Sequence, residues 1–166
     1  MSHAARILNL AAAALALTTL STSAQAQAAM TSKATCQNVG VAPQEPLGDR
    51  EGHAISVSQY SCRIEGGIAE GAIMTGMNIF EWDKGVGNAL SANGVMRKPG
   101  ASAVYEVSED KSTLTMVDGK VTGFTGSCKG VYKLATGSFA PLSGKSFTCT
   151  FRTIPGGQFA VETIVH

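Results

Sequence analysis

Residues 112–124, STLTMVDGKVTGF, hold two runs of β-branched and apolar residues on either side of Asp118-Gly119. Such runs with a period of two are typical of strands, and Asp-Gly between them is a strong signal for a two-residue hairpin turn. The segment therefore predicts a strand over 112–117, a tight turn, and a second strand from 120 to 124.

The same β pattern recurs on both sides of this hairpin. Further strands are predicted over 54–64, 68–82, 103–109, 130–134, 145–153 and 158–165. A switch in apolar phase suggests a bulge near Ser58-Gln59, and Glu109-Asp110-Lys111 is predicted to be a turn. Residues 83–101 are rich in glycine and turn residues, so they are predicted to be mostly loop with one short strand near 90–96.

No stretch after the N-terminal segment shows an apolar period of 3.6 residues over the length of an ordinary helix. The chain is therefore predicted to be all-β, with about eight or nine strands. A barrel or a sandwich accommodates such strands, and closure into a barrel removes exposed edges. We favour a small, closed, antiparallel barrel of about eight strands.

The N-terminus has the pattern of a cleaved secretory signal over residues 1–26. Arg6 precedes an apolar run from Ile7 to Leu20, which is too short to span a bilayer as a helix. Small residues permit cleavage after Ala26 or after Ala28. We expect a periplasmic or secreted protein without a membrane span, with an irregular arm over 27–52 and the barrel domain over 53–166.

Charge excludes one class of partner. Without Arg6, twelve basic side chains balance twelve acidic ones, so the mature chain has a net charge near zero. A nucleic-acid-binding domain ordinarily carries a basic surface. We therefore expect no nucleic-acid partner.

All four cysteines, Cys36, Cys62, Cys128 and Cys149, follow the predicted signal. An even number in an exported chain favours two disulfides, and no pair has the close spacing of a zinc site or a redox-active dithiol. Three pairings are possible. We favour Cys128 with Cys149, which are near one another along successive predicted strands, and this leaves Cys36 with Cys62.

The segment GSCKGVYKLATGSF, residues 126–139, resembles the glycine-x-glycine-x-tyrosine and alanine-threonine-glycine strand-turn-strand segment of the allene oxide cyclase-like and dirigent-like barrels. Upstream, Gly71–Gly76 and Tyr105-Glu106-Val107 fall where that pattern has earlier strands. Ser127-Cys128 departs from the pattern, which usually has a second glycine-threonine pair there. The departure suggests a member held together by a disulfide.

The resemblance implies an eight-stranded barrel, commonly trimeric, whose lumen binds an apolar or aromatic small molecule. Some members of that superfamily steer a cyclisation by the shape of the lumen, which requires little acid-base machinery. Two functions follow as hypotheses. One is a small-molecule-binding isomerase or cyclase, and the other is a secreted binding or structural barrel without turnover.

Two carboxylates are candidates for acid-base catalysis. Glu81 shares a predicted strand face with Ile73, Met77 and Ile79, and a carboxyl group on an apolar face has a raised pKa. Alternatively, the strand ends there and Glu81 reaches solvent. Glu106 lies on a polar face that more simply points outward.

Aromatic side chains spread over the predicted strands could line a ligand cavity or fill a core. They are Tyr60, Phe80, Trp82, Tyr105, Tyr132, Phe147 and Phe151.

Metal and cofactor sites have little support in the sequence. His53 and His166 have no partner at ligand spacing, so no metal site is predicted. No cofactor-binding motif is present either, since Gly85-Val86-Gly87 lacks the strand-to-helix context of a dinucleotide site. We expect an apolar small-molecule ligand and self-association as a dimer or trimer.

Overall fold

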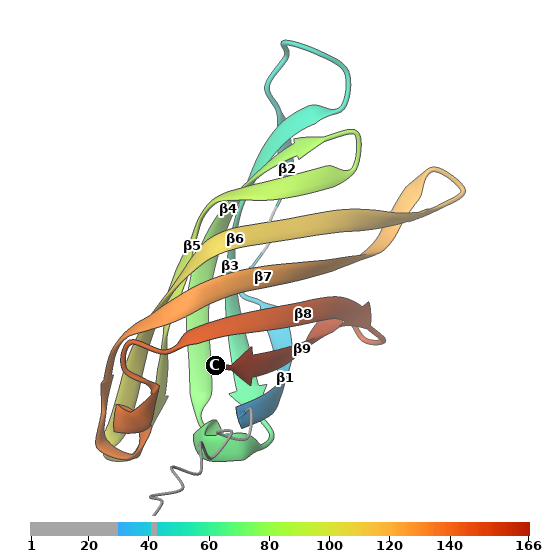
Figure 1. The fold of residues 1–166 in the computed structure, drawn as a ribbon. Coiled ribbons are helices and arrows are strands. Elements are labelled where there is room, and N and C mark those ends of the chain that lie inside the picture. Colours follow the sequence, from blue (N-terminus) through green and yellow to red (C-terminus); the bar gives the residue numbers. More distant parts are fainter. Residues whose placement is uncertain (1–29, 41–42) are drawn as a thin grey trace, which may run out of the picture.

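The computed structural model describes residues 30–40 and 43–166, and nine strands with two short 3-10 helices make up this part of the chain (Figure 1). The elements are β1 (Met30–Asn38), β2 (Gln44–Pro46), β3 (His53–Ile64), η1 (Gly67–Ala69), β4 (Ile73–Asp83), β5 (Val86–Lys98), β6 (Ala101–Val117), β7 (Lys120–Thr136), η2 (Gly137–Leu142), β8 (Ser146–Ile154) and β9 (Gln158–Val165).

The strands close into an antiparallel barrel. From β3 to β9 each strand pairs with its neighbours in sequence, and β1 pairs with both β9 and β3. The additional strand β2 continues along β3 beyond the end of β1, since Asn38 is opposite Tyr60 and Gln44 is opposite Ser56. The predicted all-β fold, a closed antiparallel barrel of eight strands, is confirmed.

The N-terminal arm predicted over 27–52 is not irregular throughout. Residues 30–38 form β1, which supplies the strand that closes the barrel, and 44–46 form β2. Only Ala34 and Cys36 of β1 are buried, so its sequence carries almost no apolar alternation. Pairing with strands distant in sequence determines this element, and a local pattern does not reveal such pairing. Residues 1–29, which include the predicted signal, lie outside the described residues.

Residues 86–98 form the long strand β5, although the sequence predicts 83–101 to be mostly loop with one short strand near 90–96. The inward positions of this strand include Gly87, Ala92 and Gly94, which give no β signal of their own. Aromatic rings lie over Gly87 and Gly94, and these two positions therefore have no room for a side chain. A Cβ atom on Gly87 would come within 2.7 Å of the Trp82 ring, and one on Gly94 within 2.2 Å of the Tyr105 hydroxyl.

Glycine opposite an aromatic residue is a repeated feature of the barrel wall. In each case the two residues are cross-strand partners, and a Cβ on the glycine would come within 2.2–2.7 Å of the aromatic side chain. The pairs are Gly76 with Tyr60, Gly87 with Trp82, Gly94 with Tyr105, Gly126 with Phe151, and Gly130 with Phe147. The aromatic side chains therefore lie close against the wall and leave the centre of the barrel open.

One end of the barrel is closed by the two 3-10 helices, which lie at the same end and contact each other (Figure 1). Phe139 and Leu142 of η2 are fully buried there beside Met96 of β5. These three are the largest fully buried side chains among the described residues. The long β6–β7 hairpin extends the wall at the other end.

Two disulfides join neighbouring strands, and both predicted pairings are confirmed. Cys36–Cys62 links β1 to β3 where the barrel closes, and Cys128–Cys149 links β7 to β8. Each pair occupies directly opposite positions in its antiparallel ladder. The bonds therefore secure the barrel wall without redirecting the chain.

Candidate functional site

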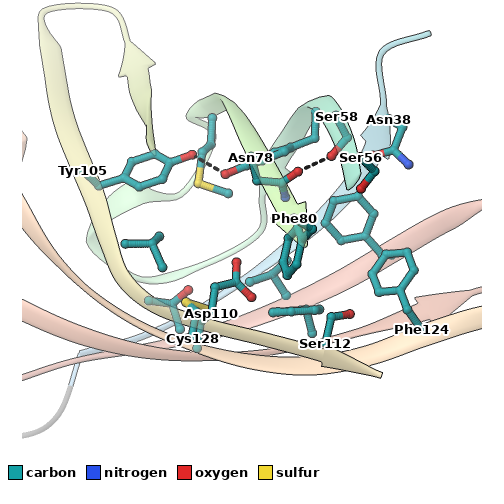
Figure 2. A pocket seen from close by; sticks show the side chains of 18 of the residues that line it. Asn38, Ser56, Ser58, Asn78, Phe80, Tyr105, Asp110, Ser112, Phe124 and Cys128 are labelled. Carbon is teal, nitrogen blue, oxygen red and sulfur yellow. Dashed lines mark hydrogen bonds between the residues drawn. A yellow bond between two sulfur atoms is a disulfide. The ribbon is translucent and has the colours of Figure 1, made fainter. Parts of the chain in front are cut away.

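The interior of the barrel contains a cavity of about 470 Å³ (Figure 2). Every strand except β5 contributes to its wall. The wall residues are Asn38, Gln44, Ser56, Ser58, Tyr60, Met74, Asn78, Phe80, Trp82, Tyr105, Val107, Asp110, Ser112, Leu114, Val121, Phe124, Cys128, Tyr132, Phe147, Cys149, Phe151, Phe159, Val161 and Thr163. Volume and composition are both in the range of small-molecule sites.

All seven aromatic residues singled out from the sequence line this cavity. Sequence reasoning missed Phe124 and Phe159, whose rings pack against each other with centroids 5.5 Å apart. Both residues lie on predicted strands, so period-two counting toward the lumen could have found them. The rings form an aromatic lining rather than a filled core.

The cavity has a closed floor and an open mouth. Tyr105, Tyr132 and Phe147 are buried near the plugged end of the barrel. Asn38, Gln44 and Val121, which also line the cavity, are exposed at the other end. A ligand would therefore enter between the end of β1, β2 and the outer part of the β6–β7 hairpin.

Asp110 is the one carboxylate among the residues that line the cavity. Its side chain points into the lumen beside Cys128, its cross-strand partner (Figure 2). The Oδ1 atom is buried, and no hydrogen-bond donor from the described residues reaches it. Burial raises the pKa of Asp110 to about 7, because loss of solvent disfavours the charged form.

A β-bulge aims Asp110 inward. The pairing of β6 with β7 shifts between Val107 and Glu109, so inward residues have odd numbers up to Val107 and even numbers from Asp110. Bulges commonly redirect a side chain in this way. The predicted turn at 109–111 is therefore wrong, because the polar residues mark a bulged strand. Counting back in steps of two from Leu114 would have placed Asp110 inside.

Two tyrosine hydroxyls meet near the floor. The Oη atoms of Tyr60 and Tyr105 are 2.9 Å apart and either can donate (Figure 2). Desolvation is the main cause that raises the pKa of both phenols. Desolvation also raises the pKa of Tyr132 to about 12. All three side chains are therefore neutral at physiological pH and offer hydroxyl groups to a ligand.

Further polar groups line the wall on β3 and β4. Trp82 Nε1 donates to Ser56 Oγ at 2.8 Å. Ser58 Oγ donates to the Asn78 side chain (Figure 2). Pairing of β3 with β4 runs without a shift from His53 to Arg63, so the bulge predicted near Ser58-Gln59 is absent. The apolar phase changes along β3 because its inward serines face the cavity.

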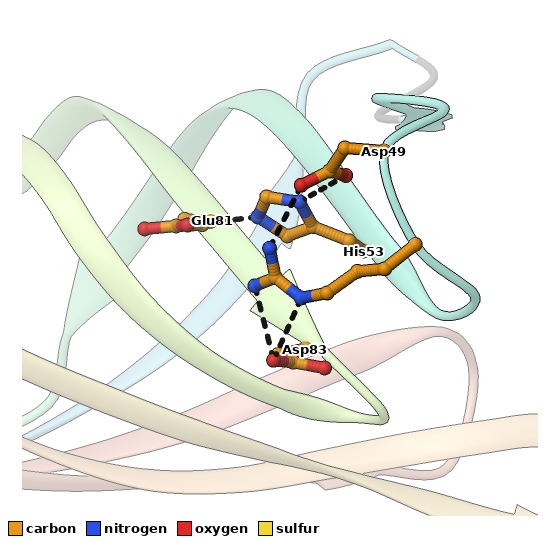
Figure 3. Close-up of polar contacts among 5 residues, drawn as sticks. Asp49, His53, Glu81 and Asp83 are labelled. Carbon is orange, nitrogen blue, oxygen red and sulfur yellow. Dashed lines mark hydrogen bonds and ion pairs between the residues drawn. The ribbon is translucent and has the colours of Figure 1, made fainter.

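Glu81 lies on the outer side of β4, away from the cavity lining. Its side chain is 44% exposed and its Oε1 atom is 2.8 Å from His53 Nε2 (Figure 3). His53 Nδ1 is also bound to Asp49, and these two carboxylates, Asp49 foremost, raise the pKa of His53. This group ties the β2–β3 loop to the end of β4. Glu81 therefore has no route to a ligand in the lumen.

Glu106 also lies outside. Its carboxylate forms an ion pair with Lys133 at 2.9 Å, and both side chains are more than half exposed. Such surface pairs contribute little to stability. The structure thus brings neither sequence-predicted carboxylate into the cavity.

No family model matches the chain, and no curated protein matches it. Among solved structures it is similar to a protein with unknown function from Clostridium acetobutylicum ATCC 824. The TM-score is 0.59 at 11% sequence identity, and the match covers 82% of this chain and 96% of that one. At this identity the similarity concerns the fold alone.

The part of the chain that the structure describes contains no cluster of three or more His, Cys, Asp or Glu side chains able to hold a metal ion. Within residues 30–40 and 43–166, no helix is long and apolar enough to cross a membrane. The chemistry available in the cavity comes from aromatic faces, hydroxyl and amide groups, and the carboxyl group of Asp110.

Proposed function

We propose that this barrel binds a small apolar or aromatic molecule in its central cavity. The observation that carries the proposal is the open, aromatic-lined space of about 470 Å³ between the plugged end and the exposed mouth. Ligand pockets of small molecules typically measure ~300–1,000 Å³ and combine apolar walls with a few polar groups. A structural barrel of this size has no need of such a space, because side chains can fill it.

The glycine-aromatic pairs support the proposal. A ring that lies against a glycine on the neighbouring strand covers the wall without entering the lumen. Larger residues at these glycines would push the rings inward and reduce the space. The resemblance to allene oxide cyclase-like and dirigent-like barrels rests partly on glycines of this framework. That resemblance implies a lumen that binds an apolar or aromatic small molecule.

We propose binding without turnover as the function of the site. The sequence-based case for acid-base catalysis depends on Glu81, which lies outside the cavity. An isomerase or cyclase of the kind that the resemblance implies would have to rely on the shape of the lumen or on Asp110.

We also propose a cellular compartment for this binding function. Two disulfides within a small domain are typical of an oxidising environment, and the N-terminal pattern is that of a cleaved signal. We place the binding function in the periplasm or outside the cell.

The test is titration with N-phenyl-1-naphthylamine, an uncharged aromatic dye that fluoresces in apolar surroundings. Val161→Trp places an indole in the lumen, whereas Ile164→Trp places the same group on the outer face of the same strand, β9. We expect saturable binding in the wild type and Ile164→Trp, and a loss of about tenfold or more in affinity in Val161→Trp.

Circular dichroism of the variants separates loss of the cavity from loss of the fold, and Val161→Phe provides a milder obstruction if Val161→Trp unfolds. Equal dye binding by the wild type and a folded Val161 variant would contradict the proposal, as would the absence of saturable binding in the wild type.

A further inference from the structure

The cavity contains a carboxyl group without a basic residue to pair with it. Asp110 is its one carboxylate, and none of the residues that line it is Lys, Arg or His. Within the described chain no donor reaches the buried Oδ1 atom. A buried charge ordinarily has a partner, because removing an ion from water without one is costly. The described part of the chain therefore supplies no cation to pair with this carboxylate in the cavity.

The neighbouring strands offer this carboxylate no charged partner at the opposite positions. On one side Asp110 is opposite Cys128, which is held in a disulfide. On the other side, the register of β5 with β6 is interrupted between Asn88–Lys111 and Ala92–Val107. Asp110 thus has no cross-strand partner in β5.

The rest of the lining suits a cation with an organic ring. The faces of aromatic rings attract cations, and the attraction increases when the pair is removed from water. Rings of β3, β4, β6, β7, β8 and β9 contribute to the wall around the lumen. An ammonium group beside Asp110 would have both a counter-charge and aromatic surroundings.

We infer that the cavity accepts a small aromatic amine whose protonated nitrogen pairs with the Asp110 carboxylate while its ring packs against the aromatic walls. This inference rests on the proposed function and names the ligand class for the same cavity. A charge-assisted hydrogen bond from the ammonium group to the Asp110 carboxylate would stabilise the charged form of that group.

Binding of an amine is coupled to the protonation of Asp110. A bound ammonium group favours the carboxylate form, so amine affinity should fall as the pH drops below about 7. The other ionisable groups that line the cavity are Tyr60, Tyr105 and Tyr132, whose raised pKa keeps them neutral. The sequence neighbours Glu109 and Lys111 are exposed on the outer face.

Three probes with one ring system test the inference: tryptamine, its uncharged alcohol analogue tryptophol, and the anion indole-3-propionate. Displacement of N-phenyl-1-naphthylamine gives their affinities. In the wild type near pH 8 we expect tryptamine to bind about tenfold tighter than tryptophol, and indole-3-propionate to bind most weakly. Lowering the pH to about 5.5 should remove the advantage of tryptamine and leave tryptophol unchanged.

Asp110→Asn removes the charge at similar volume, and Glu109→Gln is the matched control on the outer face of the same strand. We expect Asp110→Asn to bring tryptamine to within about threefold of tryptophol, and Glu109→Gln to behave as the wild type. If Asp110→Asn fails to fold, the pH dependence of tryptamine affinity in the wild type tests the inference instead.

Equal affinity for tryptamine and tryptophol in the wild type at pH 8 would overturn the inference, as would a tryptamine preference that survives in Asp110→Asn. Dye binding that persists in either case would leave the proposed function standing. Failure of the dye itself to bind would instead refute the proposed function.

Discussion

All three tyrosines of the protein, Tyr60, Tyr105 and Tyr132, line the same cavity. Their side chains are largely buried, and desolvation raises the pKa of each phenol. Each group is therefore harder to ionise in the folded protein than in the unfolded chain. Because folding favours the protonated phenols, the stability of the fold should decrease as the pH rises above about 10.

This prediction is testable by absorbance at 295 nm, which reports phenolate. We expect the native protein to show less phenolate than the unfolded protein at pH 10.5, and the remaining phenols to ionise when the fold is lost at higher pH. The urea-unfolded protein, with midpoints near the ordinary value of about 10, is the control. A native protein in which any tyrosine titrates with a midpoint near 10 would contradict the placement of these residues.

At the residue scale, the sequence predicts the aromatic lining better than it predicts the charged group. Aromatic residues on strands of a small barrel mostly face its interior, so Tyr105 and Phe147 could be chosen from pattern alone. Glu81 shares a face with apolar residues, but Ile73 and Met77 on that face are exposed. An apolar face therefore does not always point inward. The direction of Asp110 depends on a bulge, which period-two counting from upstream does not detect.

At the scale of elements, a ring and a glycine on adjacent strands act as a unit. Trp82 of β4 lies over Gly87 of β5, stacks on Phe80 with centroids 5.3 Å apart, and donates to Ser56. The indole is held on three sides by these contacts. A methyl group on Gly87 would displace the ring from this position.

We expect Gly87→Ala to lower the free energy of unfolding by about 1–3 kcal/mol through overpacking. It should also change the fluorescence emission of Trp82, the sole tryptophan, as the ring is pushed inward. Gly119→Ala in the β6–β7 turn is the control, since φ there is +73° with no atom within 4 Å. That change should cost about 1 kcal/mol and leave the emission unchanged. Unaltered emission and stability in Gly87→Ala would contradict the pairing.

The sequence did not predict β1, and it predicted only a short part of β5, for two different reasons. β1 closes the barrel through partners more than twenty residues away, and β5 places glycine and alanine toward the lumen. The hairpin of β6 and β7 was predictable because Asp118-Gly119 carries its turn signal in the sequence itself. A local sequence pattern can reveal the pairing of strands that are adjacent in sequence. The closing strand β1 has no such neighbour, since it pairs with β3 and β9.

For the molecule as a whole, the outer surface carries an apolar strip across three strands. Val95, Val104 and Leu134 occupy neighbouring register positions on β5, β6 and β7, and Leu134 is 66% exposed. Ile73 and Met77 add exposed apolar area on β4. Contiguous apolar surface of this kind is typical of interaction sites. We propose that a second copy of the chain covers it, in a dimer or trimer.

Light scattering at high micromolar concentration should therefore give a mass of two or three chains. Val104→Glu places a charge in the middle of the strip and should reduce the mass to one chain. Val117→Glu, at the tip of the β6–β7 hairpin away from the strip, is the control and should behave as the wild type. A wild type that remains monomeric would contradict self-association and leave the barrel unaffected.

The architecture of the whole molecule was the most predictable level. An absence of helical periodicity and the spacing of strand signals predict an all-β fold and favour the closed barrel that is observed, and the spacing of four cysteines favours the pairing observed. The size of the cavity was not predictable. It depends on rings lying against glycines of adjacent strands, and this register becomes known only when the strands are paired.

The central claim is that the lumen is a ligand site, and the most direct test is a crystal structure with 1-bromonaphthalene, whose bromine is located by anomalous scattering. We predict a bromine peak inside the barrel, among the rings of Trp82, Tyr105 and Phe151. A peak confined to the outer surface, or a lumen in which side chains have filled the space, would contradict the claim.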